Sequence, residues 1–256
     1  MSALPNVQDE ARRILRAASE KKVTLRLLGG VGVAMRCPST AKDTLRRHYV
    51  DMDFVAHEKQ SKAINEFFPE MGYVPRVRFN AMNGRKRLIF NDIANQRRVD
   101  IFLDVFEMSH RFNFADRLAL ERDTLPLADL LATKLQIFEI NDKDFKDLTA
   151  LFLDHDVGQA DGETINGAYI AKIASNDWGV YKTFTSNLDK LLMRLEAYGL
   201  SPPELDVART RMRKLADMIE AHPKSMSWKL RARVGDKVPW YELPEADKAV
   251  VVSELD

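Results

Sequence analysis

Val50-Asp-Met-Asp-Phe-Val55 is the segment from which both the fold and the chemistry of this chain can be worked out. Its apolar and acidic residues alternate, and a period of two is typical of a β-strand, whose successive side chains point to opposite faces of a sheet. Asp51 and Asp53 then project from the same face about 7 Å apart, and Met52 and Phe54 are left for the opposite, packed face. The segment predicts a strand with one acidic and one apolar side.

Helices and strands alternate on both sides of this strand. Upstream, apolar residues at helical spacing predict a helix over 7–21, and residues 23–28 predict a strand that ends at Gly29-Gly30, followed by a short helix to Met35. Downstream we predict a helix over 58–71, strands over 73–79 and 87–90 joined as a hairpin through Asn80-Ala-Met-Asn-Gly84, and a strand over 98–104.

From Pro126 onward the pattern becomes helical. Start and stop signals predict helices over 126–138, 141–154, 164–175, 178–198 and 202–222. After Pro223 the chain reads equally as short strands or as irregular structure. The sequence therefore predicts an α/β (α+β) fold, with a mixed sheet flanked by helices in residues 1–125 and a mainly helical part in residues 126–256.

Composition excludes several classes of protein. The chain has 256 residues, of which 45% are hydrophobic and 30% charged, and its single Cys37 cannot form an intramolecular disulfide. No apolar run approaches the roughly 18 to 20 residues that span a bilayer. We therefore expect a soluble, cytoplasmic protein with no membrane segment. Residues 1–125 hold 22 basic and 16 acidic side chains, a net of +6, while 126–256 hold 17 and 22, a net of −5, and such a basic half can attract an anion.

A third acid stands in another apolar run, Arg98-Val-Asp-Ile-Phe102. If this strand is the neighbour of residues 50–55, the carboxylate of Asp100 lies about 5 Å from the first two. Three anions at that spacing repel one another, and a hard divalent cation is the simplest compensation; oxygen ligands favour Mg²⁺ or Mn²⁺ over zinc. The alternative is that the three acids are ordinary charges on a solvated face.

Gly29-Gly30 falls between a predicted strand and a predicted helix. At such a turn, glycine allows the backbone to approach a phosphate, and the first N–H groups of the helix point at it. A phosphate cradle opposite metal-binding acids is the arrangement used in phosphoryl and nucleotidyl transfer. Taken alone, a Gly-Gly pair is equally consistent with plain turn chemistry.

Together these residues resemble the signature of the DNA polymerase beta-like nucleotidyltransferase superfamily, and more narrowly that of the AbiEii/AbiGii toxin-type nucleotidyltransferases. The similar features are Gly29-Gly-Val-Gly-Val-Ala34, the Asp51-to-Phe54 strand, Asp100 and two downstream segments, Asp129-Leu-Leu-Ala-Thr-Lys134 and Asp142-Lys-Asp-Phe-Lys-Asp147. The resemblance covers roughly residues 23–155. One departure is Val31, where the superfamily usually has Ser or Thr.

The resemblance implies transfer of a nucleoside monophosphate from an NTP to an acceptor hydroxyl. It implies that Asp51, Asp53 and Asp100 are the catalytic and metal-binding acids, with Asp100 helping to deprotonate the acceptor, and that Gly29, Gly30 and Lys134 bind the triphosphate. The acceptor would be an RNA end such as tRNA, a protein or a small molecule, and an antitoxin protein is an implied partner. The alternative is a binding or regulatory protein that keeps the fold without turnover. Lys134 and the 142–147 run also read as solvated helix positions.

Basic residues crowd the segment between the second and third acids: Arg76, Arg78, Arg85, Lys86, Arg87, Arg97 and Arg98. They could hold NTP phosphates or an RNA backbone, or they could keep an exposed hairpin soluble. Other nucleotide motifs fail: a dinucleotide fingerprint would need a glycine where Met35 stands, and no phosphate loop of the Gly-Lys-Ser/Thr type exists.

Overall fold

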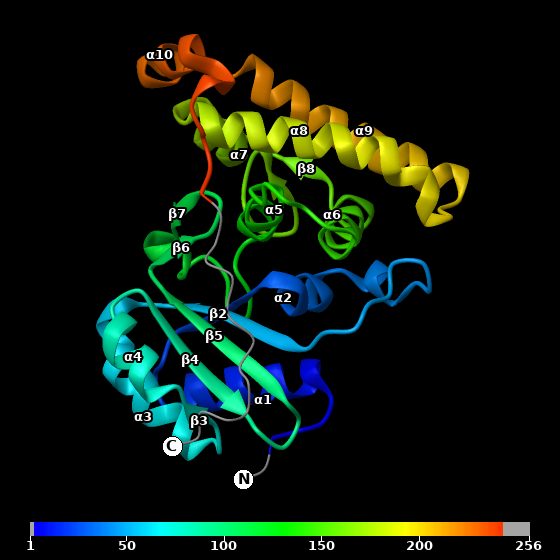
Figure 1. Cartoon of the computed structure of the whole chain (residues 1–256). Helices are drawn as coiled ribbons and strands as arrows, with labels where there is room; N and C mark the ends of the chain where they lie inside the picture. The colour runs from blue at the N-terminus through cyan, green and yellow to red at the C-terminus, as the bar shows by residue number, and fades with distance from the viewer. Residues whose placement is uncertain (1–2, 243–256) are drawn as a thin grey trace.

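A five-stranded mixed sheet forms the lower part of the molecule in Figure 1. The computed structural model describes residues 3–242. The strands are β1 (Leu25–Leu28), β2 (Asp51–Ala56), β3 (Val74–Pro75), β4 (Arg87–Asp92) and β5 (Arg97–Leu103), in the order β1-β2-β5-β4-β3. The β2–β5 pair is parallel and the other pairs are antiparallel. The sheet is mixed, as the sequence predicted.

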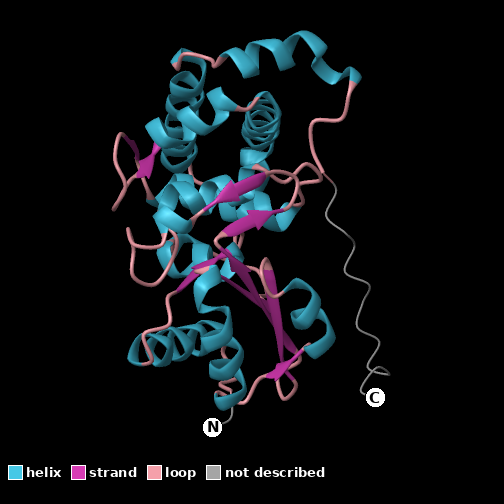
Figure 2. Cartoon of the chain, turned by 90° about the vertical axis from the view of Figure 1, so that its left-hand side faces the viewer, coloured by secondary structure: helices cyan, strands magenta, loops and turns pink. Residues whose placement is uncertain are grey.

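Helices surround the sheet and make up most of the second half of the chain. They are α1 (Val7–Glu20), α2 (Gly29–Arg36), α3 (Ser61–Glu70), α4 (Val77–Asn83), α5 (Leu127–Leu135), α6 (Asp142–Asp154), α7 (Gly167–Asn176), α8 (Trp178–Arg194), α9 (Pro202–Ala221) and α10 (Met226–Val234). Two small sheets pair β6 (Val105–Glu107) with β7 (Arg111–Asn113), and β8 (Val157–Gly158) with β9 (Ile165–Asn166). Figure 2 shows most helices gathered at one end of the molecule and the large sheet at the other.

The two faces of the sheet pack against different helices. Met52 and Phe54 point to the face covered by α1 and α3, where they join Ile14 and Phe68 in one buried apolar cluster. Val55 and Phe102 point to the opposite face and join a second cluster that runs through α5 to α9. Because side chains alternate along β2, the acids Asp51 and Asp53 belong to this second face, under α2, α5 and α6. The division into parts at residues 125 and 126 stays a prediction.

The predicted hairpin through Asn80–Gly84 is wrong in its connection. Residues 77–83 form the helix α4, although β3 and β4 do pair antiparallel, with Pro75 opposite Phe90. Asn80 is buried, and its side chain accepts from the N–H of Ile89 (2.8 Å) and donates to the carbonyl of Ile89 (3.1 Å). These bonds to the neighbouring strand hold the segment as a helix, where the local Asn-Gly signal favoured a tight turn.

The segment after Pro223, predicted as short strands or irregular structure, contains the helix α10. Ser225 caps α10 by accepting from the N–H of Trp228 (3.1 Å). Tyr241 then stacks on Phe138, with ring centroids 3.4 Å apart. Residues 243–256 of the predicted C-terminal part lie outside the described residues. Within residues 3–242, every helix is too short or too polar to cross a bilayer.

Candidate active site

The register of β2 and β5 places the three predicted acids on one face of the sheet. Asp53 stands directly opposite Asp100 in the parallel ladder, and Asp51 stands opposite Arg98. Residues two apart on a strand share a face, so Asp51, Asp53, Arg98 and Asp100 all point toward the helical part. The two distant stretches therefore meet.

Asp100 is completely buried and is held by two arginines. Arg87 Nε donates to Asp100 Oδ1 at 2.8 Å, and Arg98 Nε lies 2.7 Å from Asp100 Oδ2. A buried carboxylate is stable only when it is paired, and these guanidinium groups provide the pairing. Two arginines of the basic segment thus face the acids instead of forming a solvated hairpin surface.

Asp51 and Asp53 are only partly buried, and both have raised pKa values. Burial raises the pKa of Asp53 to about 7, with further increases from Asp100 and Asp51 that Lys134 and Arg98 oppose. Burial also raises the pKa of Asp51, Arg98 lowers it, and Asp100 raises it. No Lys or Arg of residues 3–242 forms an ion pair with either carboxylate. Because both pKa values remain raised, the nearby cations offset only part of the effect of burial and of the neighbouring acids.

Gly29 connects the predicted phosphate turn to the acids. Its φ is +64°, and a Cβ added to it would overlap Oδ2 of Asp53. The position requires glycine both for its backbone conformation and for the close approach of the carboxylate. The first residue of α2 is therefore in direct contact with the carboxylate of Asp53.

Arg47 covers the second glycine of this turn. A Cβ added at Gly30 would overlap the guanidinium of Arg47. That guanidinium donates from Nε and Nη2 to the two carboxylate oxygens of Asp147, at 2.9 and 2.8 Å, and lies 4.5 Å from the ring centroid of Tyr49. Arg47, in the segment between α2 and β2, thus places a cation on the glycine turn.

Lys134 and its acidic partners are buried, which excludes the alternative that they are solvated surface positions. Lys134 Nζ lies 2.7 Å from Asp144 Oδ1 and 2.8 Å from Asp147 Oδ2. Burial lowers the pKa of Lys134, but Asp147 and Asp144 more than offset this and raise it above its ordinary value. Lys143, in contrast, is exposed. Lys134 therefore supports Asp147, which in turn holds Arg47 beside Gly30.

The donor set fits a divalent cation at Asp51 and Asp53 better than at all three acids. Within residues 3–242, no three side chains of His, Cys, Asp or Glu lie close enough to share one metal ion. Arg87 and Arg98 already neutralise Asp100, whereas Asp51 and Asp53 offer oxygen ligands and uncompensated charge. Hard cations prefer such ligands.

Sequence reasoning missed the partners of these acids. Arg98 lies two residues before Asp100, so the period of a strand already placed both on one face. Arg87 comes from the neighbouring strand, and Arg47 is 100 residues from Asp147. No local pattern indicates either contact.

Comparisons with known proteins give limited similarity. No family model matches the chain, and no curated protein matches it. Among solved structures, the chain is similar to the crystal structure of the lincosamide antibiotic adenylyltransferase LnuA with lincomycin bound. The TM-score is 0.42 at 16% identity, over 59% of this chain and 98% of that chain. The resemblance to AbiEii/AbiGii-type enzymes stays a prediction.

Proposed function

We propose that this protein transfers a nucleoside monophosphate from an NTP to an acceptor hydroxyl. The observation that carries the proposal is the contact between Gly29, at the start of α2, and Asp53, with Asp51 and Asp100 on the same face. A glycine turn that presents backbone N–H groups beside paired carboxylates can hold a triphosphate and a cation together. In the reaction, the acceptor oxygen bonds to the α-phosphorus, the α–β phosphoanhydride bond breaks, and pyrophosphate leaves.

Asp51 and Asp53 would hold the cation, Mg²⁺ or Mn²⁺. When bound, the ion supplies positive charge to the phosphate oxygens and offsets the repulsion between the two carboxylates. The carboxylate of Asp53 lies against Gly29, so the two acids would hold the ion beside the turn. Their partial exposure leaves them accessible from outside.

The remaining residues have separate roles in binding and proton transfer. Gly29 and Gly30 would receive the triphosphate, with Arg47 as a cation beside Gly30. Lys134, predicted to contact phosphate, would act through Asp147 because both are buried in one ionic network. Asp100 would accept the proton of the acceptor hydroxyl only after one of its oxygens is released by Arg87 or Arg98.

Only the family resemblance indicates an acceptor and a biological role. By that resemblance the acceptor is an RNA end such as tRNA, a protein or a small molecule, and the protein acts as a toxin with an antitoxin partner.

A second candidate function, a binding or regulatory protein without turnover, is favoured by two observations. Asp100 is tied by two arginines, and Arg47 fills the space over Gly30. A protein locked in this arrangement binds nucleotides without transferring them.

The test is incubation with Mg²⁺ or Mn²⁺ and each α-labelled NTP, with and without bulk tRNA. We expect label transfer by the unmodified protein, and a loss of roughly 100-fold or more in Asp51→Ala and Asp53→Asn, because metal and electrostatic contributions are of this size. Asp43→Asn, which alters an exposed acid paired with Arg46, is the matched control and retains transfer. Unchanged transfer by Asp53→Asn would refute the mechanism, and nucleotide binding without transfer would favour the second function.

Folding of Asp53→Asn is checked by thermal unfolding. Because burial and the neighbouring acids disfavour the ionised carboxylate of Asp53, a neutral isostere removes repulsion. The variant should unfold at a temperature no lower than the unmodified protein. Its loss of transfer is then attributable to the site.

A further inference from the structure

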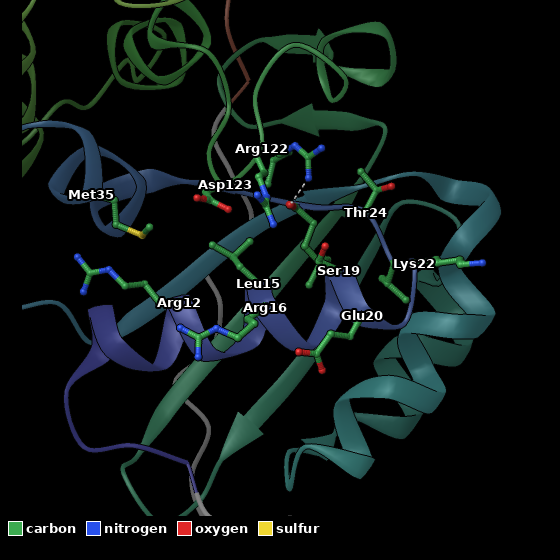
Figure 3. A pocket seen from close by; sticks show the side chains of 13 residues that line it. Arg12, Leu15, Arg16, Ser19, Glu20, Lys22, Thr24, Met35, Arg122 and Asp123 are labelled. Atoms are coloured by element: carbon green, nitrogen blue, oxygen red, sulfur yellow. Dashed lines mark hydrogen bonds between the residues drawn. The ribbon is translucent and has the colours of Figure 1, made fainter.

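A cavity of about 570 Å³ lies at the outer edge of the sheet, between α1, β1 and residues 122–123 (Figure 3). None of Asp51, Asp53, Asp100, Gly29 and Gly30 lines it. The cavity is therefore distinct from the candidate active site, and a ligand could bind in it whether or not the proposed function holds.

The lining of this cavity is predominantly basic. Its charged side chains include five basic ones, namely Arg12, Arg16, Lys22, Arg26 and Arg122. Two are acidic, Glu20 and Asp123, which leaves a net charge of +3 (five minus two). Figure 3 shows Arg12 and Arg16 projecting from α1 on one side and Arg122 from the segment opposite. Lys22 points away from the centre in this view.

Three of the arginines have no ionic partner within residues 3–242. Arg12 pairs with Asp9 at 3.0 Å, but Arg16, Arg26 and Arg122 form no ion pair there. Burial is the main cause of the lowered pKa of Arg26; Asp123 opposes it, Arg122 lowers the pKa further, and Glu121 raises it. Glu121 is already engaged by Arg36 at 3.5 Å. Like charges are thus held together with incomplete compensation.

Arg26 carries the strongest indication of a missing ligand. It is half-buried, and its Nη1 donates to the carbonyl of Leu25 at 2.8 Å, but its buried Nε has no hydrogen-bond acceptor within residues 3–242. A buried donor left unsatisfied is destabilising, and more so when it is charged. An anion in the cavity would accept this hydrogen bond.

The edge of β1 leaves room for that anion. Among the described residues, the segment 123–125 forms backbone hydrogen bonds with β1 only at Leu27. The N–H of Leu27 donates to the carbonyl of Asp123, and the carbonyl of Leu27 accepts from the N–H of Leu125. Val23 and Leu25, further along the strand, are buried and line the cavity with Leu15. These apolar walls reduce screening by water, which strengthens the interaction of an arginine with an anion.

We propose that this cavity binds a ligand with two or more linked phosphates. Guanidinium groups match phosphate oxygens in a bidentate geometry, and arginines on opposite walls suit charges that are spaced along a chain better than one carboxylate. Arg26 binds from the sheet edge, and Arg16 and Arg122 bind from the two sides. A free oligophosphate and the backbone of a single-stranded RNA share this chemistry.

Isothermal titration with the full chain tests the site, using two probes separately. The probes are inorganic tripolyphosphate and an eight-nucleotide RNA with a 5′-hydroxyl. We expect Arg26→Met, Arg16→Glu and Arg122→Glu each to weaken binding by about tenfold or more, because each variant removes a guanidinium group that would bind the phosphates. Arg213→Glu makes the same charge change at an exposed position of α9 and should remain within about twofold of the unmodified protein.

The outcomes separate the ligand sources and the site. Loss of affinity in the three cavity variants but not in Arg213→Glu supports the proposal, and the probe that binds more tightly identifies the source. Equal affinity of all variants, or no binding of either probe to the unmodified protein, overturns it. Arg16 and Arg122 are exposed, so their variants remain informative if Arg26→Met fails to fold.

Discussion

Gly29 shows how one residue without a side chain sets the geometry of the candidate site. Its positive φ, +64°, turns the chain from β1 into α2, and the space beside its Cα is filled by the carboxylate of Asp53. Any larger residue would push Asp53 out of position and strain the backbone.

We therefore expect Gly29→Ala to lower the free energy of unfolding by about 2–4 kcal/mol, because left-handed strain and overlap with Asp53 add. The measurement is urea-induced unfolding. Gly162→Ala is the matched control, since Gly162 has φ +113° and nothing within 4 Å of the added Cβ. It should show only the strain, about 1 kcal/mol. Equal losses in the two variants would mean that the contact with Asp53 is not limiting.

Individual acids were predictable from the sequence, but their partners were not. The period of two along residues 50–55 placed Asp51 and Asp53 on one face, and the register of β2 and β5 agrees with that. The ion pair between Arg87 and Asp100 depends on which strand lies next to β5. That choice is made by packing across the whole sheet, which no local pattern encodes.

Helix boundaries at the scale of elements follow local chemistry closely. Asn141 caps α6 by accepting from the N–H groups of Lys143 and Asp144, at 2.9 and 3.3 Å. Ser201 and Glu204 form a capping box at the start of α9. Such ends are fixed by the need to satisfy the first N–H groups of a helix, so they can be read from sequence.

We expect Asn141→Ala to destabilise the protein by about 1 kcal/mol through loss of the cap. The variant should also make Asp144 less rigid, because Asn141 accepts from the N–H of Asp144. The carboxylate of Asp144 in turn accepts from Lys134. Asn6→Ala removes the equivalent cap of α1, away from this network. Thermal unfolding compares the stability of both variants, and titration with an NTP compares their nucleotide binding. We expect a similar loss of stability in both and a larger loss of nucleotide binding in Asn141→Ala. Identical nucleotide binding in the two variants would contradict the link to the site.

The helix α4 shows where a prediction from local sequence fails. Asn83-Gly84 favours a tight turn, but Asn80 makes its two shortest side-chain hydrogen bonds with Ile89 of β4. A buried amide left unpaired would be costly, and this tertiary requirement outweighs the turn propensity.

Long-range ion pairs connect the segments at the scale of the whole molecule. Arg47 ties the insertion before β2 to Asp147 on α6, and Arg97 ties the N-terminal segment to the β4–β5 turn. Arg97 pairs with Asp92 at 2.5 Å and also donates to the carbonyls of Leu4 and Pro5. The Arg97–Asp92 pair is buried and the Arg47–Asp147 pair is partly buried, so removing one partner of either pair would leave a charge without its counter-ion and destabilise the protein.

The Asp92–Arg97 pair predicts a dependence of stability on pH. Burial raises the pKa of Asp92, but hydrogen bonds from Arg97 and Asn95 outweigh it and hold the pKa below its ordinary value of 3.8. A depressed folded-state pKa stabilises the protein above the unfolded-state pKa, and this contribution is lost as the pH falls through the folded-state value. Asp92→Asn should therefore destabilise the protein at pH 7, by about 2–3 kcal/mol, and by progressively less as the pH falls below 3.8.

Denaturant unfolding at pH 7 and pH 3 measures this difference. Asp206→Asn, at an exposed position of α9, should leave stability unchanged within about 0.5 kcal/mol at either pH. A deficit in Asp92→Asn that stays constant between pH 7 and pH 3 would exclude the pair as the origin of the pH dependence.

The sequence by itself determined the mixed sheet, the helical second half, the shared face of Asp51 and Asp53, and most helix ends. These features follow from side-chain period and from the hydrogen-bonding needs of neighbouring residues, which are local. Only the packing of the whole chain brings Arg87 to Asp100, Arg47 over Gly30, Lys134 into one buried group with Asp144 and Asp147, and basic side chains from separate segments into one cavity along β1. Each of these depends on charges from segments distant in the chain, which only packing brings within ionic range.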